Sequence, residues 1–306
     1  MKKLLLSCML CFLLGSFSSR PLTWVALGDS ITYLNDHQNE TGNRVEKGYM
    51  SRVVEALPGV AYVNKGFNGW TAAGVAGKIE TLGLEKADMY SVFLGTNDWW
   101  QGRAIGTLED YKNNSGNNTF FGSYRLIIDK IRSLNQKAPI LLITPMQRGD
   151  FVYIANMKNN AFGSYKDKNG QSLAAFADAV KAIAAYEKLP LVDLYRESGM
   201  TQENLVKYKR LKDPATGAYR NFPYPGFIQV PFHPETDAYP YPPDAIDMTY
   251  DGLHPSDKGN AVIAAMITKA IKKEMKFKKR ELSPKTQLLA REPGGPAGRR
   301  QATRTA

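Results

Sequence analysis

The stretch Val25-Ala26-Leu27-Gly28-Asp29-Ser30-Ile31-Thr32 joins a short apolar run to a polar turn. The apolar run predicts a buried strand, and the Gly-Asp-Ser that follows predicts a turn at the carboxyl end of that strand. A serine at the edge of a sheet can act as a nucleophile. That chemistry requires a base, a carboxylate that orients the base, and hydrogen-bond donors for an oxyanion. If Ser30 is a nucleophile, other parts of the chain must supply these groups.

Apolar runs alternate with stretches of helical periodicity through the rest of the chain. The predicted strands are residues 22–27, 60–64, 89–94, 140–144 and 189–194. The predicted helices are residues 47–57, 71–84, 120–134, 173–186 and 257–271. Because the strands are short and continuously apolar, we expect helices on both faces of a parallel sheet, which makes this an α/β protein. Ligands of such a sheet bind at the carboxyl ends of the strands, and Ser30, Gly69 and Asn97 all follow predicted strands.

The first residues have the layout of a secretory signal peptide. Two lysines precede an apolar run over residues 4–14, and small residues follow it. The run is shorter than a membrane-spanning helix needs, so we expect no membrane span. We predict a signal peptide over residues 1–19, cleaved near Ser18 or Ser19, and a secreted or periplasmic protein. A lipoprotein anchor on Cys8 or Cys11 is the alternative, and these are the only two cysteines of the chain.

The charge of the chain is concentrated at its C-terminal end. Residues 272–306 are rich in Lys, Arg, Gly and Pro and lack apolar periodicity, which predicts a basic, disordered tail. The whole chain carries a net charge of +11, but residues 20–271 hold 27 basic and 26 acidic residues. This nearly neutral segment has the length of one domain and argues against a specific nucleic-acid partner.

A candidate base lies in Asp251-Gly252-Leu253-His254-Pro255, directly before the last predicted helix. The chain contains three histidines, and His254 has a carboxylate three residues before it. In a turn, that spacing lets Asp251 accept a hydrogen bond from Nδ1 of His254 and leaves Nε2 free to take a proton. An Asx-capped turn at a helix entry would have the same residues without any catalysis.

Candidate oxyanion donors follow the second and third predicted strands. Asn97, in Gly95-Thr96-Asn97-Asp98, could donate from its side-chain amide, and Gly69 could donate from its backbone N–H. Both residue types are also ordinary turn formers, so neither signal is specific alone.

The order of these blocks is specific. Gly-Asp-Ser after the first strand, a glycine turn after the second, Gly-Thr-Asn-Asp after the third and Asp-Gly-Leu-His before the last helix resemble the four blocks of the SGNH hydrolase superfamily, also called GDSL esterases. The resemblance extends from Ala26 to about Ile271. It implies a flavodoxin-like, three-layer α/β/α sandwich with a central five-stranded parallel sheet. It also implies ester hydrolysis without a metal or other cofactor.

The same resemblance assigns roles to individual residues. Ser30 corresponds to the nucleophile, His254 to the general base and Asp251 to the residue that orients it. The backbone N–H groups of Ser30 and Gly69 and the side chain of Asn97 correspond to the oxyanion hole. Asp29 corresponds to a structural residue of the serine turn. This chain has Asn68-Gly69 where the family often has Ser-Gly, and Gly66 is the alternative donor if the register differs.

The aromatic residues bear on the substrate. Trp24 is expected in the core, whereas Trp70, Trp99 and Trp100 follow predicted strands and are candidate substrate contacts. Packing beneath a loop would account for them equally well. Residues 196–250, rich in proline and aromatic residues, form a long segment that we expect to be a wall of the site. His37, His233 and Arg148 are further candidate contacts, for each of which an ordinary surface position is the simpler interpretation.

A secreted, nearly neutral member of this superfamily with aromatic residues at its site resembles carbohydrate esterases that remove O-acetyl groups. The predicted substrate is therefore an acetylated polysaccharide or oligosaccharide. A lipolytic esterase, lysophospholipase or thioesterase of the same superfamily is the alternative. A non-catalytic glycan-binding protein is a hypothesis of another class, which the complete set of candidate catalytic residues disfavours.

Overall fold

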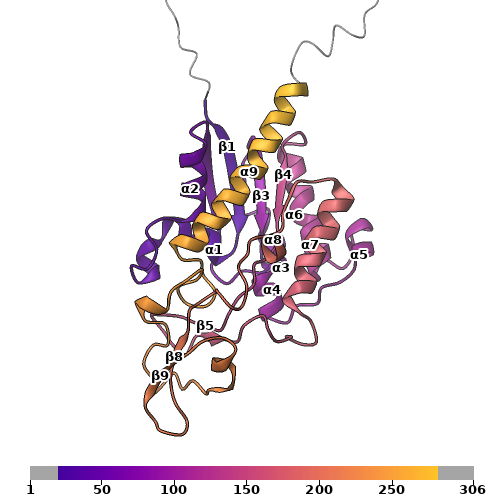
Figure 1. Cartoon of the computed structure of the whole chain (residues 1–306). Coiled ribbons are helices and arrows are strands. Elements are labelled where there is room, and N and C mark those ends of the chain that lie inside the picture. Colours follow the sequence, from indigo (N-terminus) through magenta and orange to yellow (C-terminus); the bar gives the residue numbers. More distant parts are fainter. Residues whose placement is uncertain (1–19, 282–306) are drawn as a thin grey trace, which may run out of the picture.

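The computed structural model describes residues 20–281, whose centre is a five-stranded parallel sheet (Figure 1). The strands lie in the order β2-β1-β3-β4-β7. Their bounds are β1 Leu22–Gly28, β2 Val60–Gly66, β3 Met89–Phe93, β4 Ile140–Ile143 and β7 Leu191–Val192. All five predicted strands are present, and their order is that of a flavodoxin-like sheet.

Helices cover both faces of the sheet, as its apolar strands require. Successive side chains of a strand point to opposite faces, so Val25 and Leu27 pack on one side of β1, and Trp24 and Ala26 pack on the other. The first side is covered by α3 Ala72–Lys78, α6 Phe120–Leu134 and α7 Leu173–Glu187. The second side is covered by α2 Tyr49–Ala56 and α9 Asp257–Glu281. The predicted three-layer α/β/α sandwich is confirmed.

Two predicted helix ends differ from the structure. Helix α3 ends at Lys78 instead of residue 84. Helix α9 does not end at Ile271 but continues to Glu281, so the prediction of disorder from residue 272 is wrong for its first part. Lys and Met favour helix, and Met275 still packs against the apolar cluster beneath α9. The predicted signal peptide and the rest of the predicted tail lie outside the described residues.

Several short elements were not predicted because they are too short to show a period. They include the helices α1 Ser30–Tyr33, α4 Thr96–Trp100, α5 Leu108–Lys112 and α8 Leu194–Glu197. Two antiparallel hairpins pair β5 Phe151–Val152 with β6 Asn160–Ala161, and β8 Lys209–Lys212 with β9 Tyr219–Phe222. Short 3₁₀ helices span Leu34–Asp36, Gln38–Thr41, Gly226–Gln229 and Pro243–Ala245.

The proline-rich segment packs beyond the carboxyl ends of the strands. Figure 1 shows β8 and β9 there, beside β5. Val206, Leu211, Phe227 and Tyr241 of this segment form a small apolar cluster together with Val152 of β5. Buried side chains therefore hold this part of the chain together although it contains little regular structure.

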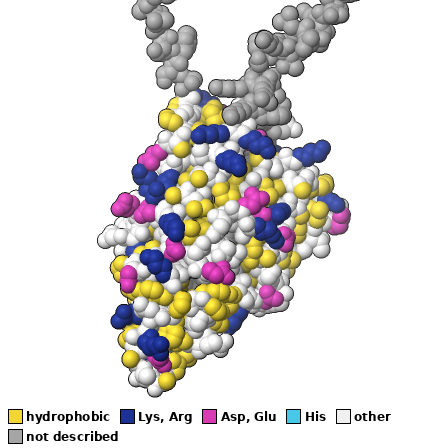
Figure 2. All heavy atoms as spheres, in the orientation of Figure 1, with side chains coloured by type: hydrophobic (Ala, Val, Ile, Leu, Met, Phe, Trp, Pro, Cys, Tyr) yellow, Lys and Arg dark blue, Asp and Glu magenta, His cyan; other side chains and the backbone are white. Residues whose placement is uncertain are grey.

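The surface agrees with the nearly neutral composition of the domain. In Figure 2, Lys and Arg side chains lie among Asp and Glu side chains over the visible face. Among the described residues, no helix is both long enough and apolar enough to cross a membrane.

The two apolar layers provide a test of the architecture. Ile127 of α6 and Ile267 of α9 are both fully buried, on opposite sides of the sheet. We expect Ile127→Ala and Ile267→Ala each to lower the free energy of unfolding by about 2–5 kcal/mol, measured by denaturant titration. Because the sheet separates the two side chains, the effects should add in the double variant to within about 0.5 kcal/mol. Leu22→Ala, at an exposed position, is the control. Strong non-additivity would contradict two independent layers.

Candidate active site

A tight turn after β1 places Ser30 at the start of α1. Asp29 caps this helix by accepting a hydrogen bond from the backbone N–H of Ile31 at 3.0 Å. The turn passes so close to its neighbours that a Cβ on Gly28 would lie 2.1 Å from Oγ1 of Thr32. Glycine is therefore required directly before the Asp-Ser pair. Asp29 is buried, and this burial raises the pKa of its carboxyl to about 6. Its position agrees with the structural role that we predicted.

A second turn, before α9, holds the histidine. Asp251 is fully buried and accepts hydrogen bonds from the backbone N–H groups of Leu253 at 3.0 Å and His254 at 2.7 Å. Its other oxygen lies 2.7 Å from Nδ1 of His254. Gly252 between them has φ +89°, and a Cβ there would lie 1.8 Å from the carbonyl oxygen of Asp150. The glycine is thus part of what allows this turn to form.

The two turns meet at the carboxyl edge of the sheet. Nε2 of His254 lies 2.9 Å from Oγ of Ser30. The rings of Phe151 and Tyr250 flank the imidazole, with ring centres 5.4 Å and 5.9 Å away. A hydroxyl, an imidazole and a buried carboxylate thus form a continuous chain of hydrogen bonds, which is the arrangement that proton transfer from a serine requires.

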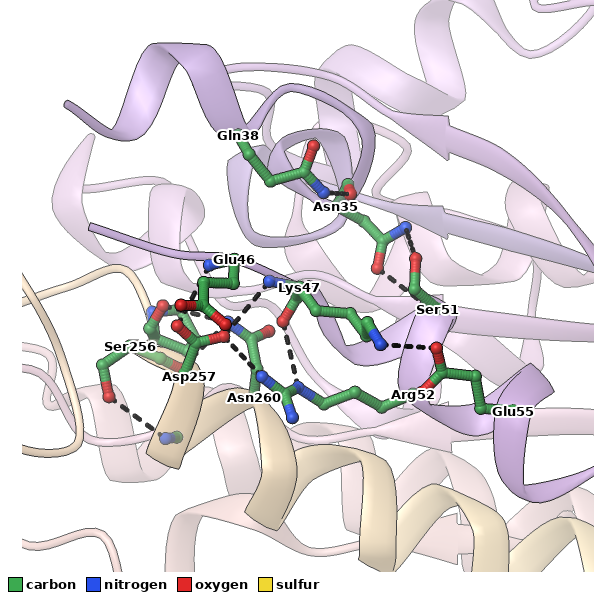
Figure 3. A network of polar contacts seen from close by, with 12 residues as sticks. Asn35, Gln38, Glu46, Lys47, Ser51, Arg52, Glu55, Ser256, Asp257 and Asn260 are labelled. Atoms are coloured by element: carbon green, nitrogen blue, oxygen red, sulfur yellow. Dashed lines mark hydrogen bonds and ion pairs between the residues drawn. The ribbon is translucent and has the colours of Figure 1, made fainter. Parts of the chain in front are cut away.

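The start of α9 is anchored to the segment before α2, as Figure 3 shows. Asp257 accepts hydrogen bonds from the backbone N–H groups of Glu46 at 3.0 Å and Lys47 at 3.1 Å, and it also pairs with Arg52. On the other side of α2, Asn35 accepts a hydrogen bond from the N–H of Met50 at 2.8 Å. The segment that follows Ser30 and the helix that follows His254 are therefore held by the same short helix.

The candidate oxyanion donors also lie at this edge. The backbone N–H groups of Ser30 and Gly69 have no hydrogen-bond acceptor within the described part of the chain. The side-chain amide of Asn97 donates one hydrogen to the carbonyl oxygen of Trp70 at 3.0 Å, which leaves its second hydrogen available. All three residues line one cavity together with His254.

Hydrogen bonds tie the loop of Gly69 to helix α4. Gln101 donates to the carbonyl oxygen of Gly69 at 3.0 Å, next to the contact of Asn97 with Trp70. Both oxygens of Asp98 accept from the N–H of Ala72 at 3.0 Å. Asp98 is fully buried, and burial raises the pKa of its carboxyl to about 7. The donors on the Gly69 loop and on helix α4 are consequently fixed relative to one another.

The cavity has a volume of about 330 Å³. Besides Ser30, its lining includes Trp100, Phe151, Tyr153 and Tyr250, together with several amide side chains. The β5–β6 hairpin and the residues that connect its strands contribute Phe151, Tyr153, Asn159 and Ala161 to the lining. The predicted wall, residues 196–250, contributes Tyr250 alone, because the rest of that segment packs around its own apolar cluster. The prediction of that wall is therefore wrong for most of the segment.

The four tryptophans differ in whether they lie in the core or at the cavity. Trp24 is fully buried in the core, as we predicted. Of the three candidate substrate contacts, Trp100 alone lines the cavity. Trp99 is fully buried and donates from Nε1 to the carbonyl oxygen of Gln171 at 3.0 Å, so it is a core residue. Trp70 stacks on Phe67, with ring centres 4.6 Å apart, and is not among the residues that line the cavity.

Of the remaining candidate residues, one lines the cavity and the others do not. His37 stacks on Tyr33, and neither His37 nor His233 lines the cavity. Gly66 lies at the end of β2, where a Cβ would meet the backbone of Tyr33, so Gly69 is the glycine that reaches the cavity. Arg148 is the exception, because it is buried and lines the cavity instead of occupying the expected surface position.

The cavity residues from the β5–β6 hairpin have no signal in the sequence. Phe151, Tyr153 and Asn159 line the cavity, yet Phe151 lies in a strand of two residues and the other two lie in the connection to the next strand, so no alternation marks them. Within the described residues, no group of three or more His, Cys, Asp or Glu side chains is arranged to hold a metal ion.

The buried carboxyl of Asp98 predicts a pH-dependent stability. The pKa of Asp98 is higher in the folded protein than in the unfolded chain. Its stabilising contribution to the free energy of unfolding is therefore fully present below about pH 4 and is lost as the pH rises through about 7. Asp98→Asn removes this loss and keeps one acceptor for Ala72. We expect the variant to gain stability relative to the wild type between pH 4 and 7.5, by on the order of 4 kcal/mol. Denaturant titrations at several pH values measure it, with the exposed Asp178→Asn as control. A constant difference across this range would contradict the burial argument.

Comparisons with known proteins agree with this geometry. The family model of the GDSL-like lipase/acylhydrolase family matches residues 26–262. A crystal structure described as "a possible lipase" from Chitinophaga pinensis is 62% identical, with a TM-score of 0.82, over 82% of this chain and 98% of that chain. A Lactobacillus plantarum protein of known structure shares the fold at 21% identity, with a TM-score of 0.55, over 82% of this chain and 96% of that chain. No curated protein matches the chain. The chain belongs to the GDSL-like lipase/acylhydrolase family.

Proposed function

We propose that the protein is an exported serine esterase that hydrolyses carboxylic esters through an acyl-enzyme. The observation that carries this proposal is the contact of Ser30 Oγ with His254 Nε2 at 2.9 Å, in a cavity that Gly69 and Asn97 also line. Family membership supports ester hydrolysis as the reaction. In this proposal Ser30, His254 and Asp251 are the catalytic residues, and the N–H groups of Ser30, Gly69 and Asn97 form the oxyanion hole.

The first half of the reaction forms the acyl-enzyme. Oγ of Ser30 attacks the ester carbonyl carbon while Nε2 of His254 takes the hydroxyl proton. Asp251 holds the ring through Nδ1 and stabilises the imidazolium that forms. The negative charge develops on the carbonyl oxygen, where each oxyanion donor contributes on the order of 3 kcal/mol in comparable sites. The alcohol then leaves with the proton from His254.

The second half hydrolyses the acyl-enzyme by the same groups. Water gives a proton to His254 and attacks the acyl carbon, and the oxyanion returns to the same donors. The carboxylic acid then leaves as His254 returns the proton to Oγ of Ser30. Because Nδ1 of His254 is held by Asp251 throughout, Nε2 can accept and return a proton in both halves.

The substrate that we propose is an O-acetylated carbohydrate. The indole of Trp100 and the phenol rings of Tyr153 and Tyr250 line the cavity beside amide groups of Asn68 and Asn159. Flat rings that can stack on sugar faces, next to hydrogen-bonding amides, suit a polyhydroxylated ligand.

The substrate proposal is tested by measuring acetate release from a panel of acetylated polysaccharides, together with a series of 4-nitrophenyl esters of increasing acyl length. We expect acetate release from at least one polysaccharide and a preference for short acyl groups. A preference for long acyl groups would favour the lipolytic alternative, and a preference for acyl-coenzyme A substrates would favour a thioesterase.

The serine itself is tested by Ser30→Ala. We expect turnover of 4-nitrophenyl acetate to fall by several orders of magnitude, about 10⁶-fold in comparable sites, with an unchanged midpoint of thermal unfolding. Ser133→Ala, at the far end of α6, is the control and should keep wild-type turnover. Wild-type protein without serine-dependent turnover would favour the non-catalytic glycan-binding hypothesis.

The orienting carboxylate is tested by Asp251→Asn. The amide keeps the shape of the carboxylate but favours the wrong tautomer of His254, so turnover should fall by roughly 10⁴-fold while the fold is retained. Kinetics with 4-nitrophenyl acetate and a circular dichroism spectrum measure both effects. Turnover near that of the wild type would mean that another group orients the imidazole.

A further inference from the structure

Arg148 carries a buried positive charge that nothing in the described chain neutralises directly. Its side chain is 1% exposed, and both Nε and Nη2 are buried without a hydrogen-bond partner. Within residues 20–275 its guanidinium makes no hydrogen bond and no ion pair. A buried guanidinium is normally paired, because an isolated charge is costly to remove from water. Burial lowers the pKa of Arg148 to about 10, so the group is still a cation at neutral pH.

The carboxylates whose charges act on Arg148 are each engaged elsewhere. Asp251 accepts from His254 and from two backbone N–H groups. Asp150 accepts from Lys209 at 2.9 Å, from the hydroxyl of Tyr165 and from a backbone N–H. Asp29 accepts from the backbone of its own turn. These groups act on the pKa of Arg148 through space, and none of them is within hydrogen-bond reach of the guanidinium.

Hydrogen bonds hold the backbone of Arg148 at the wall of the cavity. Its backbone N–H donates to Oγ of Ser164 at 3.1 Å, and its carbonyl oxygen accepts from Ser164 and from Gln202. The guanidinium lies 5.5 Å from the ring centre of Trp99 and 5.3 Å from that of Trp100. Arg148 lines the cavity that contains Ser30 and His254. Glu40, the carboxylate among the lining residues, is held by the hydroxyl of Tyr33 at 2.8 Å.

We propose that Arg148 binds an anionic group of the ester substrate, so that the enzyme acts on esters that carry a carboxylate close to the ester bond. The inference rests on the esterase activity proposed above and names the substrate class within it. An acetylated sugar with a carboxylate, such as an acetylated uronic acid residue, has this charge on the alcohol side. A dicarboxylic acid monoester has it on the acyl side. A planar guanidinium matches a carboxylate in either position.

Two matched pairs of substrates test this with the wild-type protein. The first pair is the acetylated methyl glycosides of galacturonic acid and galactose, and the second is the 4-nitrophenyl esters of succinate and butyrate. We expect kcat/KM of the anionic member to exceed that of the neutral member by about tenfold or more in one pair, which also identifies the side that carries the charge. A neutral member that reacts equally well or better in both pairs would overturn the proposal.

Variants of Arg148 assign the preference to this side chain. Arg148→Met should lower the anionic-to-neutral ratio of kcat/KM about tenfold or more, and Arg148→Lys should lower it less. The control is Lys168→Met, because Lys168 lies 4.4 Å from the ring centre of Trp100 but does not line the cavity. This control should keep the ratio. If Arg148 only balanced the charge of Asp251, both members would lose activity by the same factor and the pH profile would shift, which contradicts substrate binding.

A binding measurement separates this proposal from the esterase proposal. Calorimetric titration with methyl galacturonoside, methyl galactoside, succinate and butyramide needs no turnover. We expect binding of one of the two anions to the wild type, loss of that binding in Arg148→Met, and weaker binding of its neutral counterpart. Absence of turnover together with Arg148-dependent anion binding would overturn the esterase alone. Serine-dependent turnover without anion binding or anion preference would overturn the role of Arg148 alone. If Arg148→Met does not fold, the wild-type pairs and Arg148→Lys still decide.

Discussion

The contact between Ser30 and His254 depends on the whole domain, because it joins residues that are 224 positions apart in the chain. Ser30 follows the first strand, and His254 precedes the last helix. Only the parallel sheet brings these two ends to one edge, with β1 at the point where the strand order reverses. Any change that moves β1 relative to α9 therefore acts on a distance that must remain within hydrogen-bond reach. The anchoring of α9 to Arg52 of α2, and of the segment after Ser30 to Met50 of α2, limits that movement.

The donors around the proposed oxyanion are held by one another before any substrate binds. Asn97 donates to the carbonyl oxygen of Trp70, and Asp98 accepts from the N–H of Ala72 at the start of α3. In the proposed reaction, donors that are already oriented do not have to reorganise as charge develops, which is where such donors gain most of their effect. Burying the carboxyl of Asp98 in this contact with Ala72 costs stability. Burial disfavours the ionised form in the folded protein, which is why the pKa of Asp98 is raised.

The sheet, its covering helices and the blocks that meet at its edge could be predicted, because apolar runs and turn residues encode them locally. The cavity lining could not, because it depends on which way single side chains point. Trp99 and Trp100 are adjacent, and the short helix α4 turns one into the core and the other toward the cavity. Arg148 has no local signal, since its burial depends on residues distant in the sequence, such as Trp99 and Trp100 beside its guanidinium. The run of lysines after Ile271 predicts disorder from composition alone, which does not register that Met275 packs against the cluster beneath α9.

The ionisable groups buried around the cavity differ in how many hydrogen-bond partners they have. Asp251 has three donors, Asp98 has one N–H shared by both oxygens, and Asp29 has a backbone N–H. Arg148 has aromatic rings beside it and no acceptor. Stability alone does not account for that last arrangement, because an apolar side chain of similar volume would fill the same space without the cost of burying a charge. A cation in this place gains its partner only when an anion enters the cavity. The same unpaired charge that lowers the stability of the fold therefore strengthens binding of a carboxylate beside Ser30 in the proposed reaction.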